Sequence, residues 1–309
     1  MNSAIPVNLN TTLGAIQIGI LASYVLFGVT TAQAYVYYSR FPDDSFKLKA
    51  LIAIVWICEL ALTLCLGHTL YTYTISDYAQ PERLLSRVPP SLGVAAFFDG
   101  FVALCVQGFF SYRLYAFTKT LYIPAVVSVL TFLQLLGTTV IFVMALRMTS
   151  MPLFVVQWRW LLTSTWAVTS VNDWVITLSL VAALISQRDY AQKRTVTMVN
   201  KLVLWTIETG MLTSLMSIVM MACFLSMKDN FIWIGLFTVQ QRLFSNSLLA
   251  SLNSRSTLRA LNEVSLPSLH LASRVLSTSV NLANPTTQLV NDAEPEPALG
   301  KGKVAFEDV

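Results

Sequence analysis

The chain has 309 residues, of which 55% are hydrophobic and only 12% are charged, and its mean hydropathy is +0.63. Ordinary soluble domains carry about 25% charged residues, so this composition excludes a typical soluble protein. The net charge of +4 is spread over the connections between apolar stretches. This excludes the clustered basic face of a nucleic-acid-binding protein and predicts contact with anionic lipid headgroups instead.

Long apolar stretches predict an all-α integral membrane bundle of seven transmembrane helices. In chain order they are 13–37, 50–74, 91–115, 121–146, 160–185, 202–226 and 230–252. Each is long enough to cross a hydrocarbon core of about 30 Å as a helix. A helix also satisfies its backbone hydrogen bonds within one segment, as lipid requires. The transmembrane domain is therefore predicted at 13–254, after a short extracellular N-terminus at 1–12.

Lysine and arginine side chains predict the orientation of the bundle. They are more frequent in the connections after the first, third and fifth stretches, and beyond the seventh, than in the other connections. Because positive charge stays on the cytosolic side, we expect the N-terminus outside and the C-terminus in the cytosol. The plasma membrane is the favoured location, with an endomembrane as the alternative. Asn10-Thr11-Thr12 is a candidate glycosylation sequon on the outer side, close to the first stretch.

The end of the chain differs in composition from the rest. Residues 255–309 are rich in Ser, Asn, Leu and Pro, and no apolar period persists long enough for a core. Such a segment cannot bury enough apolar surface to offset its conformational entropy. We therefore predict a mostly disordered cytosolic tail.

Polar side chains inside the apolar stretches form the candidate functional cluster. They are Glu59, His68, Asp99, Gln107, Asp173, Glu208 and Arg242. A charge at the bilayer centre costs about 2.5–3.5 kcal/mol on insertion scales, so charged side chains should face the bundle interior or a partner.

Depth along the helices suggests how these groups pair. Arg242 is the only base near the midplane, and its predicted partner is Asp173, with Glu59 as the second choice. His68 and Asp99 both lie in the outer half and are predicted to pair. The cluster is either an interhelical hydrogen-bond network or a site for a small-molecule or ion ligand, and the sequence leaves both open.

Small residues spaced four apart predict close contacts between helices. These pairs are Gly19 and Ser23, Gly28 and Ala32, Gly210 and Ser214, and Ser247 and Ser251.

No enzyme, cofactor or metal site is predicted. The two histidines, His68 and His270, cannot build a three-histidine zinc site. The seventh stretch has no lysine for a retinal Schiff base, and neither a GxSxG motif nor a glycine-rich phosphate loop occurs.

Four motifs in the last third of the apolar region occur in a recognisable order. They are NDWVI at 172–176, TIETGMLTSL at 206–215, DNFI at 229–232 and NSLLASLNSR at 246–255. The region 171–259 resembles a large family of multi-span proteins from mushroom-forming fungi, which is defined by a domain of unknown function, 6534. The segments 12–15 and 35–42 resemble the first helix of that family.

The resemblance implies a fungal seven-span membrane protein. It does not point to any particular activity, because the family has none assigned. The chain departs from the family pattern at 240–244, where QQRLF replaces a motif similar to SKLY. A base persists there, so that Arg242 remains the buried cation in the comparison.

The architecture favours a receptor-like or sensory membrane protein, by analogy only. One alternative is a transporter or a proton or ion pathway through the acids Glu59, Asp99, Asp173 and Glu208, since proton relays use carboxyl groups at membrane depth. The other alternative is a structural membrane organiser. The predicted partners are the lipid bilayer and a small-molecule or ion ligand in the bundle.

Overall fold

The computed structural model describes residues 8–78, 89–148, 150–189, 193–227 and 230–255. Within these ranges the secondary structure is entirely helical. The chain order is η1 (Asn10–Gly14), α1 (Ala15–Arg40), α2 (Phe46–Tyr71), η2 (Thr72–Ser76), α4 (Pro90–Thr118), α5 (Tyr122–Arg147), α6 (Met151–Asp189) and α7 (Lys193–Ser226). A further α-helix at 232–255, here the last helix, follows. The predicted tail at 255–309 lies outside the described residues apart from its first position.

Local sequence explains where α4 begins and ends. Pro90 occupies the first turn of α4, where its fixed φ and missing N–H suit a helix start. The helix ends at Thr118, and Lys119 closes it with a φ of 54°, a left-handed conformation that stops further helical bonding. The short connection that follows returns the chain as α5, which packs against α4.

Among the described residues, six helices are long and apolar enough to cross a membrane: Asn10–Arg40, Phe46–Ser76, Pro90–Thr118, Tyr122–Arg147, Pro152–Ser186 and Thr206–Ser226. They confirm six of the predicted stretches and indicate an integral, multi-pass membrane protein. Helices α6 and α7 begin about nine residues before the predicted starts at 160 and 202, because no helix-breaking residue stops the helix at the end of the apolar run.

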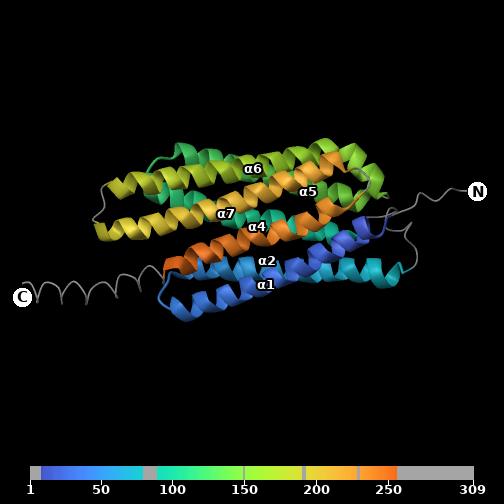
Figure 1. The fold of residues 1–309 in the computed structure, drawn as a ribbon, viewed down its shortest axis with the longest axis horizontal. Coiled ribbons are helices and arrows are strands. Elements are labelled where there is room, and N and C mark those ends of the chain that lie inside the picture. The colour runs from blue at the N-terminus through green and yellow to red at the C-terminus, as the bar shows by residue number, and fades with distance from the viewer. Residues whose placement is uncertain (1–7, 79–88, 149, 190–192, 228–229, 256–309) are drawn as a thin grey trace, which may run out of the picture. The chain divides into compact units, whose positions relative to one another are not determined.

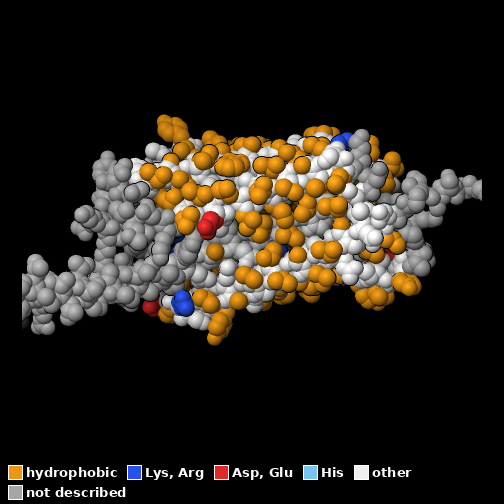
Figure 2. Space-filling model, viewed as in Figure 1, with side chains coloured by type: hydrophobic (Ala, Val, Ile, Leu, Met, Phe, Trp, Pro, Cys, Tyr) orange, Lys and Arg blue, Asp and Glu red, His pale blue; other side chains and the backbone are white. Residues whose placement is uncertain are grey.

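The surface of the helical unit is apolar and its interior contains many polar groups. Large apolar side chains such as Ile18, Val25, Leu64 and Leu178 are more than half exposed, and Figure 2 shows hydrophobic side chains over most of the described face in view. Soluble monomers rarely expose apolar patches larger than a few hundred Å². Lipid is therefore the solvent that this surface fits.

The last helix is enclosed by the other helices. None of its residues is exposed, whereas each of the six candidate spans has exposed apolar side chains. In Figure 1 it is drawn in orange and lies beside α1 and α2, with α4 to α7 on its other side. Because this helix needs no lipid-facing side chains, it tolerates Gln240, Gln241 and Arg242 in its middle.

The last helix runs parallel to α1. Gly19 and Gly235 meet so closely that a Cβ on Gly19 would lie 2.4 Å from the Gly235 Cα. Further along, the Asn246 side chain donates to the Leu26 backbone oxygen at 3.3 Å, and the Asn253 side chain donates to Gln33 at 2.8 Å. Residue numbers rise together along both helices, so their directions agree.

The predicted small-residue contacts are confirmed in part. Gly19 packs on the last helix, and Gly210 of α7 lies against Thr177 of α6. The prediction for Gly28 and Ala32 is wrong, since both are exposed and no atom lies within 4 Å of a Cβ built on Gly28. These two residues lie on the lipid-facing side of α1, where no other helix packs against them.

Candidate functional site

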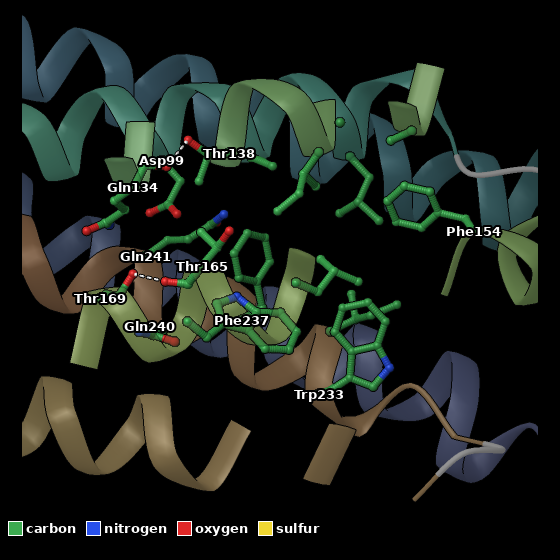
Figure 3. Close-up of a pocket in the computed structure, with 18 of the residues that line it drawn as sticks. Asp99, Gln134, Thr138, Phe154, Thr165, Thr169, Trp233, Phe237, Gln240 and Gln241 are labelled. Carbon is green, nitrogen blue, oxygen red and sulfur yellow. Dashed lines mark hydrogen bonds between the residues drawn. The ribbon is translucent and has the colours of Figure 1, made fainter. Parts of the chain in front are cut away.

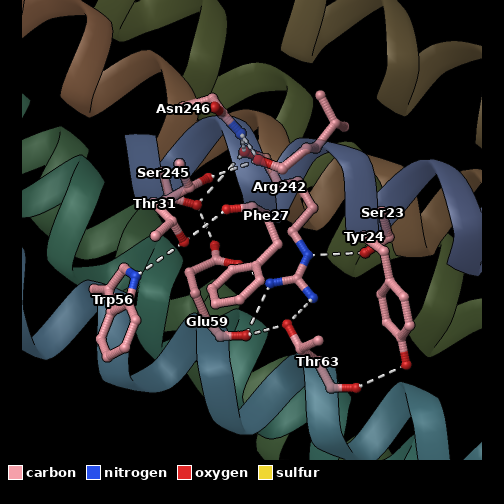
Figure 4. A network of polar contacts seen from close by, with 12 residues as sticks. Ser23, Tyr24, Phe27, Thr31, Trp56, Glu59, Thr63, Arg242, Ser245 and Asn246 are labelled. Carbon is pink, nitrogen blue, oxygen red and sulfur yellow. Dashed lines mark hydrogen bonds and ion pairs between the residues drawn. The ribbon is translucent and has the colours of Figure 1, made fainter. Parts of the chain in front are cut away.

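Arg242 of the last helix and Glu59 of α2 form an ion pair in which both side chains are fully buried (Figure 4). The Arg242 Nη1 group donates to Glu59 Oε2 and, at 2.9 Å, to the Glu59 backbone oxygen. Its Nε group donates to Ser23 Oγ of α1 at 2.8 Å, and Nη2 donates to Thr63 Oγ1 of α2 at 2.9 Å. The pair therefore joins three helices.

The polar atoms of this pair are almost fully satisfied. Ser245 donates to Glu59 Oε1, so both carboxylate oxygens accept hydrogen bonds. The Phe27 ring covers the guanidinium with 5.4 Å between the ring centroid and Cζ, within the range of a cation–π contact. Neither Arg242 nor Glu59 lines either of the two cavities described below. We therefore assign this pair to the packing of the bundle.

The pairing corrects the first choice made from the sequence, since Arg242 contacts Glu59 and not Asp173. An α-helix turns by about 100° per residue, so Gln240, Gln241 and Arg242 face three directions. Gln240 Nε2 donates to Ser217 of α7, while Arg242 faces α1 and α2. Asp173 lies in α6, on another side of the last helix.

Asp173 belongs to a second network, formed by side chains of α4, α5 and α6. Gln107 Nε2 lies 3.2 Å from Gln134 Oε1 and 3.5 Å from Asp173 Oδ1. Asn172 Nδ2 donates to Gln107 Oε1 and to Thr131 Oγ1, both at 3.0 Å. The second oxygen of Asp173, Oδ2, is buried without a partner among the described residues.

A small cavity of about 40 Å³ adjoins this network, between α4, α6, α7 and the last helix. Gln107, Asp173, Thr213 and Ser247 supply polar groups to its lining, and Phe244 covers one side. One water needs about 10–15 Å³ of such space, so the small cavity has room for a few waters or an ion.

His68 and Glu208 join neither network. His68 Nδ1 lies 3.1 Å from Ser91 Oγ, and the predicted pairing with Asp99 is wrong. Ser91 is in the first turn of α4, whereas Asp99 lies eight residues, or about 12 Å, further along that helix. Glu208 of α7 is exposed, so its carboxyl group lies outside both networks.

A larger cavity of about 80 Å³ lies between α4, α5, α6 and the last helix. Figure 3 shows its polar residues gathered at one end and the rings of Phe154 and Trp233 toward the other. Trp166 and Phe237 complete its aromatic walls. The polar end contains Asp99, Gln134, Thr138, Thr165, Thr169, Gln240 and Gln241.

Polar atoms at this end lack partners. Asp99 Oδ1, Gln240 Oε1 and both amide atoms of Gln241 are buried and form no hydrogen bond with any described residue. An unsatisfied buried polar group costs about 1–3 kcal/mol, and more than about 90% of such groups are paired in native proteins. Several such groups surround one cavity, where a water or a ligand can pair with them.

The two cavities share one lining residue, and a hydrogen bond joins a lining residue of one cavity to a lining residue of the other. Phe244 lines both the large and the small cavity. Gln134, which lines the large cavity, accepts the hydrogen bond from Gln107, which lines the small one. Asp99 and Asp173 are thus in separate chambers of the same bundle.

Sequence reasoning missed the amides and rings of the large cavity. Gln134 is a polar residue inside the fourth apolar stretch, and Gln240 and Gln241 interrupt the seventh. These interruptions were the available signal. The tryptophans gave no signal, since Trp233 near a helix start is equally typical of a membrane interface.

The fold and these buried sites define a multi-pass helical membrane protein with polar chambers inside the bundle. Residues 169–257 match a family of unknown function (DUF6534). This segment covers α6 from Thr169, α7 and the last helix, and so contains Asp173, Gln241 and Arg242. It confirms the domain of unknown function predicted for 171–259. No curated protein and no solved structure matches the chain.

Proposed function

We propose that the protein is a receptor-like membrane protein that binds a small molecule in the large cavity. The observation that carries this proposal is the set of unpaired polar groups on Asp99, Gln240 and Gln241, buried beside aromatic walls. Ligand pockets combine mostly apolar walls with a few converging polar groups in this way. A protein that only organised the membrane would have no use for unpaired groups at a cavity.

The proposal includes seven crossings, with the last helix as the seventh. The support is its parallel course along α1, with contacts from the Phe231 N–H donating to Thr11 at 3.1 Å to Asn253 donating to Gln33 at 2.8 Å. A helix that follows a candidate span over its length traverses the same thickness of bilayer. With the N-terminus outside, as the distribution of Lys and Arg favours, the aromatic end of the large cavity faces the exterior at the plasma membrane.

Cysteine accessibility tests this proposal. In a background in which Cys58, Cys65, Cys105 and Cys223 are replaced by alanine, Ala96→Cys places a thiol in the lining of the large cavity, one turn from Asp99. A charged, membrane-impermeant thiol reagent added outside should modify this variant. The control, Leu178→Cys, lies on a residue that is 59% exposed to lipid and should not react, because no water reaches it.

Two results would count against the proposal. No modification of Ala96→Cys from either side would mean that the cavity is closed to external ligands. Modification from the cytosolic side alone would show that the bundle has the opposite orientation in the membrane.

A second function, transport of protons or ions, is favoured by one observation. The large cavity with Asp99 and the small cavity with Asp173 share Phe244 as a wall, and the Gln107–Gln134 hydrogen bond connects them. Glu59 does not extend this path, because Arg242 and Ser245 occupy its oxygens.

Electrical recording from reconstituted bilayers distinguishes the two functions. A transport path predicts a pH-dependent current that Asp173→Asn abolishes and that Phe244→Ala increases. No current from either the unmodified protein or Phe244→Ala would exclude transport and favour the receptor-like function.

A further inference from the structure

The lining of the large cavity has an acid without a basic partner. Asp99 is the only acidic or basic residue in its lining, which contains no lysine, arginine or histidine. The nearest base along the last helix, Arg242, is occupied by Glu59, Ser23 and Thr63. A ligand that brings a positive charge therefore complements the cavity, whereas an anion would meet Asp99 without compensation.

The unpaired groups are mostly acceptors. They comprise the oxygens Asp99 Oδ1, Gln240 Oε1 and Gln241 Oε1 and a single donor, Gln241 Nε2. An ammonium group offers three N–H donors and no acceptor, while a hydroxyl offers only one donor. Asp99 and Gln241 lie next to each other at the polar end in Figure 3. Their oxygens are positioned to share one donor-rich group.

The rest of the cavity fits an apolar body. Trp166 and Trp233, with 5.8 Å between ring centroids, stand with Phe237 beyond the polar end. Aromatic faces attract cations within about 6 Å and also bury apolar groups. The 80 Å³ of the cavity corresponds to about five to eight waters, at about 10–15 Å³ for each. Because each water occupies about 30 Å³ in the liquid, this is about 150–240 Å³ of liquid volume, which a ligand of about ten non-hydrogen atoms fills.

We infer that the large cavity binds a small apolar amine, with its ammonium group on Asp99 and Gln241 and its apolar body against Trp166 and Trp233. This inference rests on the proposed function and specifies the ligand class of the same cavity. Its recognition element is a charge-assisted hydrogen bond, which is about twice as strong as a neutral one.

A matched pair of probes tests the inference. 2-Phenylethylamine and 2-phenylethanol have the same carbon skeleton and differ in carrying an ammonium or a hydroxyl group. Both are titrated by calorimetry into the full chain in lipid nanodiscs at pH 7, with empty nanodiscs to subtract partitioning. The amine should bind saturably and about tenfold or more tightly than the alcohol.

Asp99→Asn supplies the decisive variant, because it keeps the size of the side chain and removes its charge. It should raise the dissociation constant of the amine by about tenfold or more and change that of the alcohol by less than about twofold. The control, Glu208→Gln, makes the same type of change at an exposed acid outside the cavity. It should leave the binding of both probes unchanged.

Specific results would overturn the inference. Equal affinities of amine and alcohol for the unmodified chain, or an amine preference that survives Asp99→Asn, would remove Asp99 as the recognition group. If neither probe binds but Ala96→Cys reacts from outside, amine binding is refuted and the receptor-like function stays in place. An unreactive Ala96→Cys would refute that function itself.

A second variant covers the case in which Asp99→Asn does not fold. Gln241→Leu removes one acceptor from the polar end and should weaken the amine about threefold or more while sparing the alcohol. Equal effects on both probes would contradict the proposed contact.

Discussion

Removing one member of the Arg242–Glu59 pair should cost more stability than removing both. Arg242→Met leaves the Glu59 carboxylate fully buried, with only Ser245 as a side-chain partner. Glu59→Met likewise leaves a buried guanidinium without a counter-charge. The double variant replaces both ions with apolar side chains of similar length, so no charge is left unpaired.

The contacts give the size of the effect. Arg242 makes four hydrogen bonds, to Ser23, Thr63, the Glu59 carboxylate and the Glu59 backbone. At about 0.6 kcal/mol for each hydrogen bond inside a membrane protein, their loss costs about 2–3 kcal/mol. The stranded carboxylate adds to this, which gives about 3–5 kcal/mol, as for other broken buried pairs. The double variant should lose less than either single variant, which puts its loss at least about 3 kcal/mol below the sum of the single losses.

Reversible unfolding in mixed detergent micelles, followed by tryptophan fluorescence, measures these free energies. Arg255→Met is the matched control, because Arg255 forms a 2.6 Å ion pair with Asp44 while 33% exposed. Its Cζ also lies 4.7 Å from the Phe41 ring centroid, so its loss should cost about 1–2 kcal/mol. Two results would show that this pair does not hold the three helices together. One is a loss of unfolding free energy below about 1 kcal/mol for Arg242→Met, and the other is a double-variant loss equal to the sum of the two single losses.

Two further predictions concern packing. Gly235→Ala places a Cβ 2.5 Å from a backbone oxygen of α1 and should destabilise the bundle by about 1–3 kcal/mol. Gly28→Ala, whose new Cβ has no atom within 4 Å, should stabilise it by up to about 1 kcal/mol. Equal Tm values of the two variants in a thermal melt would contradict the close approach of α1 and the last helix. Gln107→Leu breaks hydrogen bonds to two other helices and should cost about 1–3 kcal/mol. Thr139→Val removes only a bond within α5, of 2.7 Å, and an equal loss of unfolding free energy from both variants would argue against the amide network.

Sequence was a good guide to which segments form helices in lipid. Runs of about 20 apolar residues have few alternatives once the backbone must satisfy its own hydrogen bonds, and six of the predicted stretches appear as helices of suitable length and hydropathy. The last helix is the informative case. Its hydropathy is lowered by Gln240, Gln241 and Arg242, which are tolerated because the other helices, and not lipid, surround it.

The pairing of buried groups could not be predicted in the same way. Sequence position gives the depth of a side chain in the membrane but not the rotation of its helix about its own axis. Asp173 and Glu59 were at similar predicted depths, and only the packed helices show that Arg242 faces α2. The same limit explains the error for His68, whose contact with Ser91 depends on how α2 and α4 pack.

The large cavity was overlooked for a related reason. An ionisable residue such as Asp99 is conspicuous in an apolar stretch, whereas the neutral amides Gln134, Gln240 and Gln241 cost less in a membrane and are less distinctive. A cavity also arises from side chains that fail to fill space between four helices, and no single segment records that. Its aromatic walls come from positions as distant as Phe154 and Trp233.

The topology of the chain can be measured directly with one protease-sensitive tag at residue 1 and a second at residue 309. Intact cells are treated with protease before and after selective permeabilisation, and both tags are followed in the same sample. If the last helix is the seventh crossing, the first tag is cleaved in intact cells and the second only after permeabilisation. Cleavage of both tags under the same condition would show an even number of crossings and contradict the arrangement that opens the large cavity to the exterior.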